Sequence, residues 1–190
     1  MDVMLEISAR HIHLSREDFF NLFSKTEKFE AKKFLSQKGQ FLSFLKADVI
    51  GLKSILKGVS ILGPFRKNTQ IEVSLTDSKK LGIDIPIKES GDLIDTPGCI
   101  LKTEFGEIKI NKGLIVAKRH VHLSCESAKK FNLKNGKNVS VKVDSGERSL
   151  IFFKTIVRIS ENFTDAVHID TDEANAAGIK QDKNYCELII

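Results

Sequence analysis

The five histidines of this 190-residue sequence lie at three places along the chain. They are His11 and His13, His120 and His122, and, apart from these two His-x-His patterns, His168. Side chains at residues i and i+2 of a β-strand point to the same face of the strand. Each His-x-His pattern therefore presents two imidazoles side by side, an arrangement typical of two ligands of one divalent metal ion. We predict that these histidines bind metal.

The two patterns are part of an internal repeat. LEISARHIHLS (5–15) and LIVAKRHVHLS (114–124) align without a gap at an offset of 109 positions. Farther along, TDSKKLGI (76–83) resembles TDEANAAGI (171–179), which has one extra residue. A similarity that includes the histidines and returns in a second block indicates a duplicated unit.

The same repeat suggests a third ligand for each pair. Glu72 precedes its Thr-Asp dipeptide by four residues and His168 precedes its own by three, each within a short extended segment. Three protein ligands with open positions are typical of catalytic zinc sites. Zn²⁺ is the favoured ion, and Co²⁺, Mn²⁺ or Fe²⁺ also suit nitrogen and carboxylate ligands. The predicted sets are His11, His13 and Glu72, and His120, His122 and His168.

One arginine is a candidate for substrate binding. Arg66 follows the Gly63-Pro64 turn and precedes Glu72 by six residues. A guanidinium is suited to bidentate recognition of phosphate or carboxylate. The sequence has no Walker, GxGxxG or GxSxG motif, so P-loop, Rossmann and α/β-hydrolase chemistries have no support.

The elements that position these residues are predicted to be short. After each His-x-His pattern, Ser15 and Ser124 precede an acidic, amphipathic stretch, which predicts an N-cap and a short helix. Elsewhere, β-branched runs at intervals of roughly 8–12 residues favour small barrels over a doubly wound sheet. We predict a mainly β (α+β) fold of two small β-barrel domains, related by the repeat, with short capping helices. The predicted ranges are 1–112, with a helical insertion over 19–41, and 113–190.

Composition bounds the class of protein. Hydrophobic residues make up 41% and charged residues 29%, which is ordinary for a globular protein. The sequence shows neither an apolar run long enough to span a membrane nor a secretory signal, so a cytoplasmic location is predicted. The net charge of +5 suits an anionic ligand, but no nucleic-acid-binding pattern appears. A disulfide framework is not expected from the three separated cysteines, Cys99, Cys125 and Cys186.

Blocks along nearly the whole chain resemble the PduL-type phosphotransacylase family, the phosphate propanoyltransferases. Both the order and the spacing of the blocks fit this family. The blocks are SARHIHLS (8–15), QKGQF (37–41), ILGPFRKNTQIEVSLTD (61–77), LGI, ESGDL and TPG within 81–98, KRHVHLS (118–124), and ISENF and HIDTDEANAAGI within 159–179.

The resemblance implies two β-barrel domains with a di-metal site, usually zinc, between them. The implied reaction is acyl-CoA + phosphate ⇌ acyl phosphate + CoA, with an acetyl or propionyl group. The metal held by the Glu72 set would also meet the CoA sulfur, and the metal held by the His168 set would take water or phosphate. Arg66 matches the family arginine that contacts phosphate. Phosphate is then expected to attack the thioester carbonyl directly, without a covalent acyl-enzyme.

The resemblance also implies CoA contacts and a homodimer. The CoA-contacting positions would be Ser8, Lys33, Leu62 and Asn175. The family often has a basic residue two positions before its LGP segment, where this chain has Ser60, so one phosphate contact is expected to be missing.

The cellular location is also an expectation. The first predicted strand begins within a few residues of Met1, which leaves no room for an N-terminal microcompartment-targeting extension, so we expect a free cytosolic enzyme.

Two other functions fit the histidines. A zinc-dependent hydrolase predicts a water-activating carboxylate or an H-x-H-x-D-H pattern, whereas Leu-Ser follows both His-x-His patterns. A non-enzymatic metal-binding module predicts closed coordination and no role for Arg66. Release of CoA from acyl-CoA with and without phosphate separates the three functions.

Overall fold

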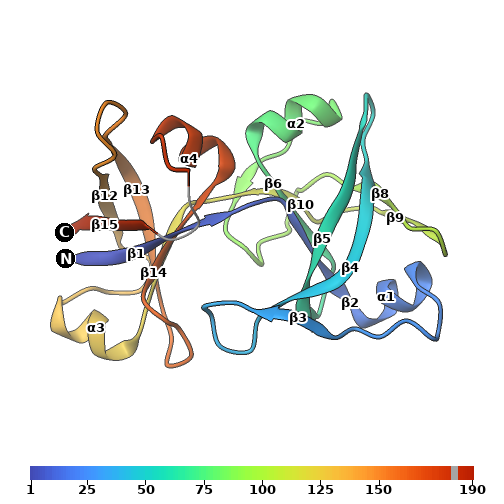
Figure 1. The fold of residues 1–190 in the computed structure, drawn as a ribbon, viewed down its shortest axis with the longest axis horizontal. Coiled ribbons are helices and arrows are strands. Elements are labelled where there is room, and N and C mark those ends of the chain that lie inside the picture. The colour runs from blue at the N-terminus through green and yellow to red at the C-terminus, as the bar shows by residue number, and fades with distance from the viewer. Residues whose placement is uncertain (181–183) are drawn as a thin grey trace. The chain divides into compact units, whose positions relative to one another are not determined.

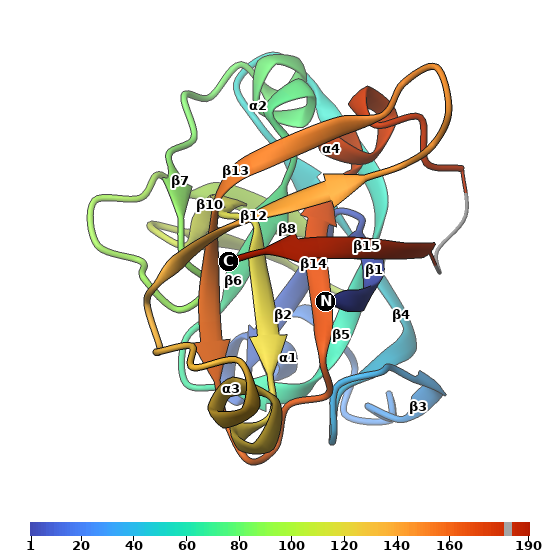
Figure 2. The same ribbon diagram turned by 90° about the vertical axis from the view of Figure 1, so that its left-hand side faces the viewer.

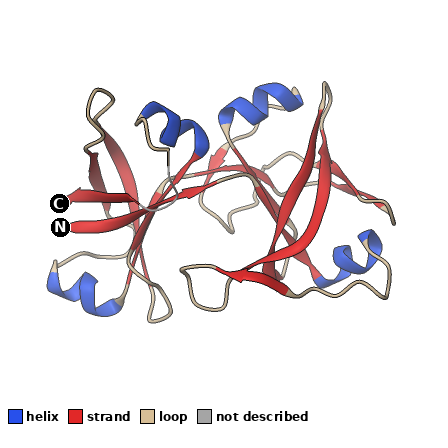
Figure 3. Cartoon of the chain, in the orientation of Figure 1, coloured by secondary structure: helices blue, strands red, loops and turns tan. Residues whose placement is uncertain are grey.

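The computed structural model describes residues 1–180 and 184–190. The fold is mainly β, as predicted, with short helices between the strands (Figures 1 and 3). In chain order the elements are β1 (Asp2–Ser8), β2 (His11–Ser15), α1 (Arg16–Leu22), β3 (Ala31–Phe34), β4 (Phe41–Ile50), β5 (Ile55–Arg66), β6 (Gln70–Val73), α2 (Leu75–Leu81), β7 (Ile87–Lys88), β8 (Cys99–Lys102), β9 (Glu107–Ile110), β10 (Leu114–Ala117), β11 (His120–Leu123), α3 (Cys125–Lys130), β12 (Asn138–Val143), β13 (Leu150–Ile159), β14 (Ala166–Asp170), α4 (Thr171–Ala176) and β15 (Asn184–Ile189). None of the described helices is long and apolar enough to cross a membrane.

One compact unit consists of Met1–Ala9 and Lys118–Ile190. Its strands close into a barrel in the order β1-β14-β11-β13-β12-β15, and these strands are nearest the viewer in Figure 2. Along β12 the sequence NVSVKV alternates polar and apolar residues, and its three valines are buried, because successive side chains of a strand point to opposite faces. The barrel core is made mainly of aliphatic side chains, among them Val3, Leu5, Val121, Leu123, Val141, Val157 and Val167.

The other compact unit is Arg10–Ala117. Its sheet has the order β7-β10-β6-β2-β5-β4-β8-β9, with β3 paired to β4. This sheet is a curled half-barrel with β7 and β9 at its ends, and it stands where the sequence predicts the other small β-barrel. The core lies on one side of the curled sheet and includes Ile12, Leu14, Phe19, Leu22, Val49, Ile61, Ile71 and Leu101.

The compact units differ from the continuous ranges predicted from the sequence, which divide after residue 112. β1 pairs in parallel with β14, and Leu5 is the register partner of Val167. β10 pairs in parallel with β6, and Leu114 is the register partner of Ile71. All four side chains are fully buried. The first strand of each repeat therefore completes the sheet of the other unit, so no single cut separates the two cores.

The predicted helical insertion over 19–41 is wrong. Helix α1 ends at Leu22, and the chain then runs irregularly to the short strand β3. Phe23, at the C-cap, already has an extended backbone with φ −125°. Phe29 stacks on Phe65 of β5, with ring centroids 4.6 Å apart. The many lysines and glutamates favour a helix by propensity, but anchoring of the phenylalanines on the sheet outweighs that preference.

The predicted helix starts are confirmed. The side chain of Ser15 accepts a hydrogen bond from the Asp18 amide at the start of α1, and Ser124 accepts one from the Ser127 amide at the start of α3. Helices α2 and α4 begin with capping boxes. The four strands that carry the predicted metal ligands, β2, β6, β11 and β14, are thus each followed by a helix whose first turn is fixed by side-chain hydrogen bonds.

Candidate metal centres

In the sheet unit, β2 and β6 bring together the first predicted set of ligands. His11 of β2 is the direct cross-strand partner of Glu72 in the antiparallel strand β6. His11 Nε2 lies 3.2 Å from His13 Nε2 and 3.6 Å from Glu72 Oε2. All three residues are buried, and their ligand atoms lie within 4.8 Å of one another. We call His11, His13 and Glu72 the sheet triad.

Neighbouring side chains orient the Glu72 carboxylate. Its Oε1 accepts hydrogen bonds from Gln70 Nε2 at 2.6 Å and from Ser90 Oγ at 2.9 Å. Gln70 is itself held by the Gly91 amide, which donates to its Oε1 at 2.8 Å. Because Oε1 is engaged in this way, Oε2 is the oxygen turned toward His11. Such outer contacts fix the direction of a metal-ligating carboxylate.

Arg66 stands beside the sheet triad. Its Nη1 donates to Ser90 Oγ at 3.0 Å, so one serine links the guanidinium to the Glu72 carboxylate. Burial, followed by the neighbouring His11 ring and the positive charge of Arg66, holds the pKa of His13 well below its ordinary value. His13 is therefore neutral at physiological pH, the form in which imidazole binds a metal ion.

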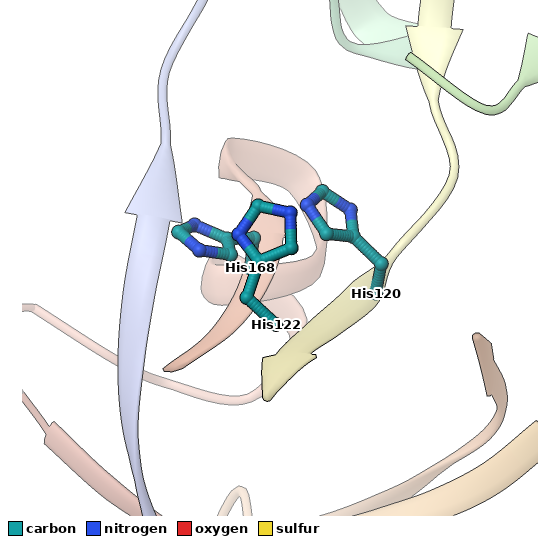
Figure 4. Close-up of side chains that lie close together, drawn as sticks. All are labelled: His120, His122 and His168. Atoms are coloured by element: carbon teal, nitrogen blue, oxygen red, sulfur yellow. The ribbon is translucent and has the colours of Figure 1, made fainter. Parts of the chain in front are cut away.

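In the barrel unit, β11 and β14 bring together the second predicted set. His120 of β11 is the direct cross-strand partner of His168 in the antiparallel strand β14. The three imidazoles converge in Figure 4, with ring centroids 4.6 Å apart for His120 and His122 and 4.8 Å apart for His122 and His168. Their ligand nitrogens lie within 4.8 Å of one another. We call His120, His122 and His168 the barrel triad.

Contacts around the barrel triad constrain its rings. His120 Nδ1 lies 2.9 Å from the Lys118 carbonyl oxygen, to which it can donate, and that bond leaves Nε2 for a ligand. Phe163 stacks on His122, with ring centroids 3.9 Å apart and planes inclined by 23°. His168 Nδ1 lies 3.7 Å from Glu6 Oε2. The rings are thus held by a carbonyl, a phenyl ring and a carboxylate.

The chemical state of the barrel triad fits a divalent metal ion. Both ring nitrogens of His122 are buried and have no hydrogen-bond partner among the described residues. Burial, then the adjacent His120 and the charge of Arg158, lower the pKa of His122 to about 3, so the ring is neutral at physiological pH. Buried polar atoms are normally satisfied, and a neutral imidazole without a protein partner is suited to metal ligation.

The four predicted CoA contacts fall into two groups, one in each unit. In the sheet, Lys33 pairs with Leu42, Leu42 with Leu62, and Leu62 with His13, so the two predicted contacts lie in one cross-strand row with a triad histidine. In the barrel unit, Ser8 is the register partner of Asp170, which caps the helix that contains Asn175. Lys33 and Asn175 are exposed.

Several residues beside the triads were not predicted from the sequence. Ser90 and Phe163 lie within the ESGDL and ISENF blocks. The resemblance of those two blocks to the family could have indicated that these residues lie near the triads. Gln70 precedes Glu72 by two residues and therefore points to the same face of β6, which strand periodicity could have indicated. Glu6 could not be found, because its place beside His168 depends on a pairing between distant strands. Cys125 is exposed at the start of α3 and belongs to neither triad.

Comparison with known proteins gives consistent matches along the chain. A family model described as phosphate propanoyltransferase matches residues 4–180. A phosphate propanoyltransferase of Clostridioides difficile (strain 630) is 44% identical over 176 residues, covering 93% of this chain and 84% of that protein. One of Shewanella putrefaciens is 41% identical over 188 residues, covering 99% and 89%. One of Thermotoga maritima is 41% identical over 175 residues, covering 92% and 83%.

Proposed function

The chain belongs to the phosphate propanoyltransferase family, and from this premise we propose that its sheet and barrel triads each hold a divalent metal ion that serves the acyl transfer. The reaction is the conversion of acyl-CoA and phosphate to acyl phosphate and CoA. Zn²⁺ is the proposed ion for both triads, because three nitrogen or carboxylate ligands with an open position are typical of catalytic zinc sites.

The observation that carries the metal proposal is the cross-strand pairing within each triad. In the sheet the pair is His11 with Glu72, and in the barrel it is His120 with His168. The repeat thus places the three predicted ligand positions in both units. In each unit, strand pairing brings these positions together from distant parts of the chain. The ring nitrogens of His122, which have no hydrogen-bond partner within residues 1–180 and 184–190, give independent support.

We propose that phosphate attacks the thioester directly. A phosphate oxygen forms a bond to the thioester carbonyl carbon, the carbon–sulfur bond breaks, and CoA leaves as the thiolate. When bound, metal ions supply Lewis acidity and positive charge, which stabilise a leaving thiolate and bind phosphate. Arg66 offers a guanidinium beside the sheet triad, and its paired N–H donors suit phosphate oxygens.

The cysteines give no support to an acyl-cysteine intermediate. Burial raises the pKa of both Cys99 and Cys186 to about 12, so neither is a thiolate at physiological pH. Cys125 is exposed on α3 and belongs to neither triad. A direct transfer needs no protein nucleophile and agrees with these environments.

We propose that Lys33 and Leu62 contact CoA from the sheet unit, and Ser8 and Asn175 from the barrel unit. The support in the sheet is the shared row with His13, and an exposed lysine suits a CoA phosphate. Replacement of Lys33 by alanine is expected to raise the KM for acyl-CoA severalfold while the KM for phosphate stays unchanged. The neighbouring exposed Lys32 is the matched control for this replacement.

The homodimer implied by the family resemblance and the cytoplasmic location stay predictions. Light scattering on the purified protein is expected to give twice the mass of one chain.

The test of the proposed function is release of CoA from acetyl-CoA and propionyl-CoA, with and without phosphate, before and after chelation. We expect release that requires phosphate, yields acyl phosphate, stops after chelation and returns with Zn²⁺. Release without phosphate would favour the zinc-dependent hydrolase. No release from either acyl-CoA would favour the non-enzymatic metal-binding module. The ratio of the two rates shows whether acetyl or propionyl is preferred.

A further inference from the structure

A carboxylate from the N-terminal strand faces the barrel triad. Glu6 of β1 is the register partner of His168 in the parallel strand β14, and β1 runs beside His168 in Figure 4. Glu6 Oε2 lies 3.7 Å from His168 Nδ1. The two side chains are only 19% and 14% exposed, so the interaction between them is weakly screened by solvent.

The repeat places a different residue at the corresponding position of the sheet. The counterpart of Glu6, 109 positions later, is Ile115 of β10, which is the register partner of Glu72 and fully buried. One row of cross-strand partners therefore reads His11, Glu72, Ile115, and the corresponding barrel row reads His120, His168, Glu6. Each row holds one carboxylate, which is a triad member in the sheet and a neighbour of the triad in the barrel.

We propose that Glu6 is a positioning residue for the barrel triad. Its carboxylate, 3.7 Å from His168 Nδ1, favours the tautomer that carries the proton on Nδ1 and so presents Nε2 as the metal ligand. His168 Nε2 is turned away from solvent, as this role requires. A carboxylate behind a ligating histidine also makes the imidazole a stronger donor. The negative charge of Glu6 partly offsets the positive charge of a metal ion held by three imidazole ligands, which bring no negative charge of their own. The proposal rests on the metal sites proposed above.

The test is the Zn²⁺ affinity of the barrel site, measured by competition with a chromophoric chelator. Replacement of Glu6 by glutamine keeps the size of the side chain and removes its charge. We expect this variant to lose about 10- to 100-fold in affinity at one of two sites and to keep the other unchanged, the usual consequence of removing a partner of a ligating histidine. Glu6→Asp is expected to recover part of the loss. Asp2→Asn, which removes an exposed carboxylate from the same strand, is the matched control.

The outcomes separate this inference from the proposed function. If the wild-type protein binds two Zn²⁺ ions and Glu6→Gln leaves both affinities unchanged, Glu6 has no positioning role. If Glu6→Gln removes one ion as completely as His168→Ala does, Glu6 is itself a ligand, and the inference is wrong. If the wild-type protein binds no Zn²⁺, the metal sites fail together with the inference. Unchanged affinity at the sheet site in Glu6→Gln would show that the variant is folded.

Discussion

His11 and Glu72 are direct cross-strand partners in the sheet unit, with Nε2 and Oε2 3.6 Å apart, and His120 and His168 have the same relationship in the barrel unit. A pair of antiparallel neighbours holds two side chains on one face at short range. The second histidine of each pattern lies two residues farther along the strand and so shares that face. The duplicated fold thus preserves three positions while allowing a carboxylate in one unit and an imidazole in the other.

Metal removal is expected to destabilise the protein. An ion that binds only the folded state stabilises it by about 2.7 kcal/mol at a free concentration 100 times its Kd. Chelation should therefore lower the midpoint of thermal unfolding by several degrees, and added Zn²⁺ should restore it. Differential scanning calorimetry measures both midpoints, with Mg²⁺ as the control addition. Identical midpoints before and after chelation would show that the triads do not hold a metal ion that contributes to folding.

Arg66 is expected to affect the use of phosphate. Loss of a charge-assisted hydrogen bond is worth about 1.5–3 kcal/mol, which corresponds to roughly 10- to 100-fold in binding. Arg66→Ala should therefore raise the KM for phosphate by about that factor and leave the KM for acyl-CoA nearly unchanged. Steady-state kinetics with each substrate varied in turn provides the measurement, and Lys67→Ala, at the exposed neighbouring position, is the control. A change confined to the KM for acyl-CoA would assign Arg66 to CoA instead.

The arginine that precedes each His-x-His pattern forms an ion pair with an acidic residue of a helix in the same unit. Arg10 Nη1 lies 2.9 Å from the buried carboxylate of Asp77 in α2, and Arg119 pairs with Glu173 in α4. Both acids occupy the third helical position (N3), and their side chains complete the capping boxes of α2 and α4. Because Arg10 is partly exposed, replacing it with methionine should lower the free energy of unfolding by about 1 kcal/mol.

Urea denaturation tests the Arg10–Asp77 pair. Lys79→Met, on the exposed surface of α2, is the control and should change stability by less than about 0.5 kcal/mol. In a double-mutant cycle with Asp77→Asn, the two changes should be non-additive, because they remove one interaction. Strict additivity would mean that the ion pair contributes nothing to stability.

The three thiols are expected to differ in reactivity. Cys99 and Cys186 are buried, and burial raises the pKa of each thiol to about 12. At pH 8 each of these thiols is therefore ionised in only about one molecule in ten thousand. Cys125 is exposed. A disulfide reagent should react promptly with one thiol in the folded protein and with the other two only after unfolding, and Cys125→Ser should abolish the prompt reaction. Three thiols reacting at one rate would contradict the burial of Cys99 and Cys186.

The sequence was sufficient to predict the triads, because the repeat and the period of a strand are local features. The offset of 109 residues relates the two His-x-His patterns, and the second block of the repeat led to Glu72 and His168. The mainly β class and the serine caps of α1 and α3 also follow from local patterns. These predictions needed no knowledge of which strands pair.

The parts that could not be predicted depend on contacts between distant segments. The exchange of β1 and β10 between the units is a choice of partner strand, which composition and periodicity do not encode. Glu6 reaches His168 only through that exchange. Ser90 reaches Glu72 from a loop 18 residues away in the sequence. In residues 19–41, the packing of Phe29 on Phe65 outweighs the helix propensity of the local sequence.

The number of tightly bound metal ions per chain tests the central claim most directly. Elemental analysis of the purified, zinc-loaded protein is expected to give two ions for the wild-type chain, one for His13→Ala and one for His122→Ala, with none in the double variant. Each substitution removes one member of one triad and leaves the other triad intact. One ion in the wild-type chain, or loss of both ions from either single variant, would contradict two separate triads that each hold an ion.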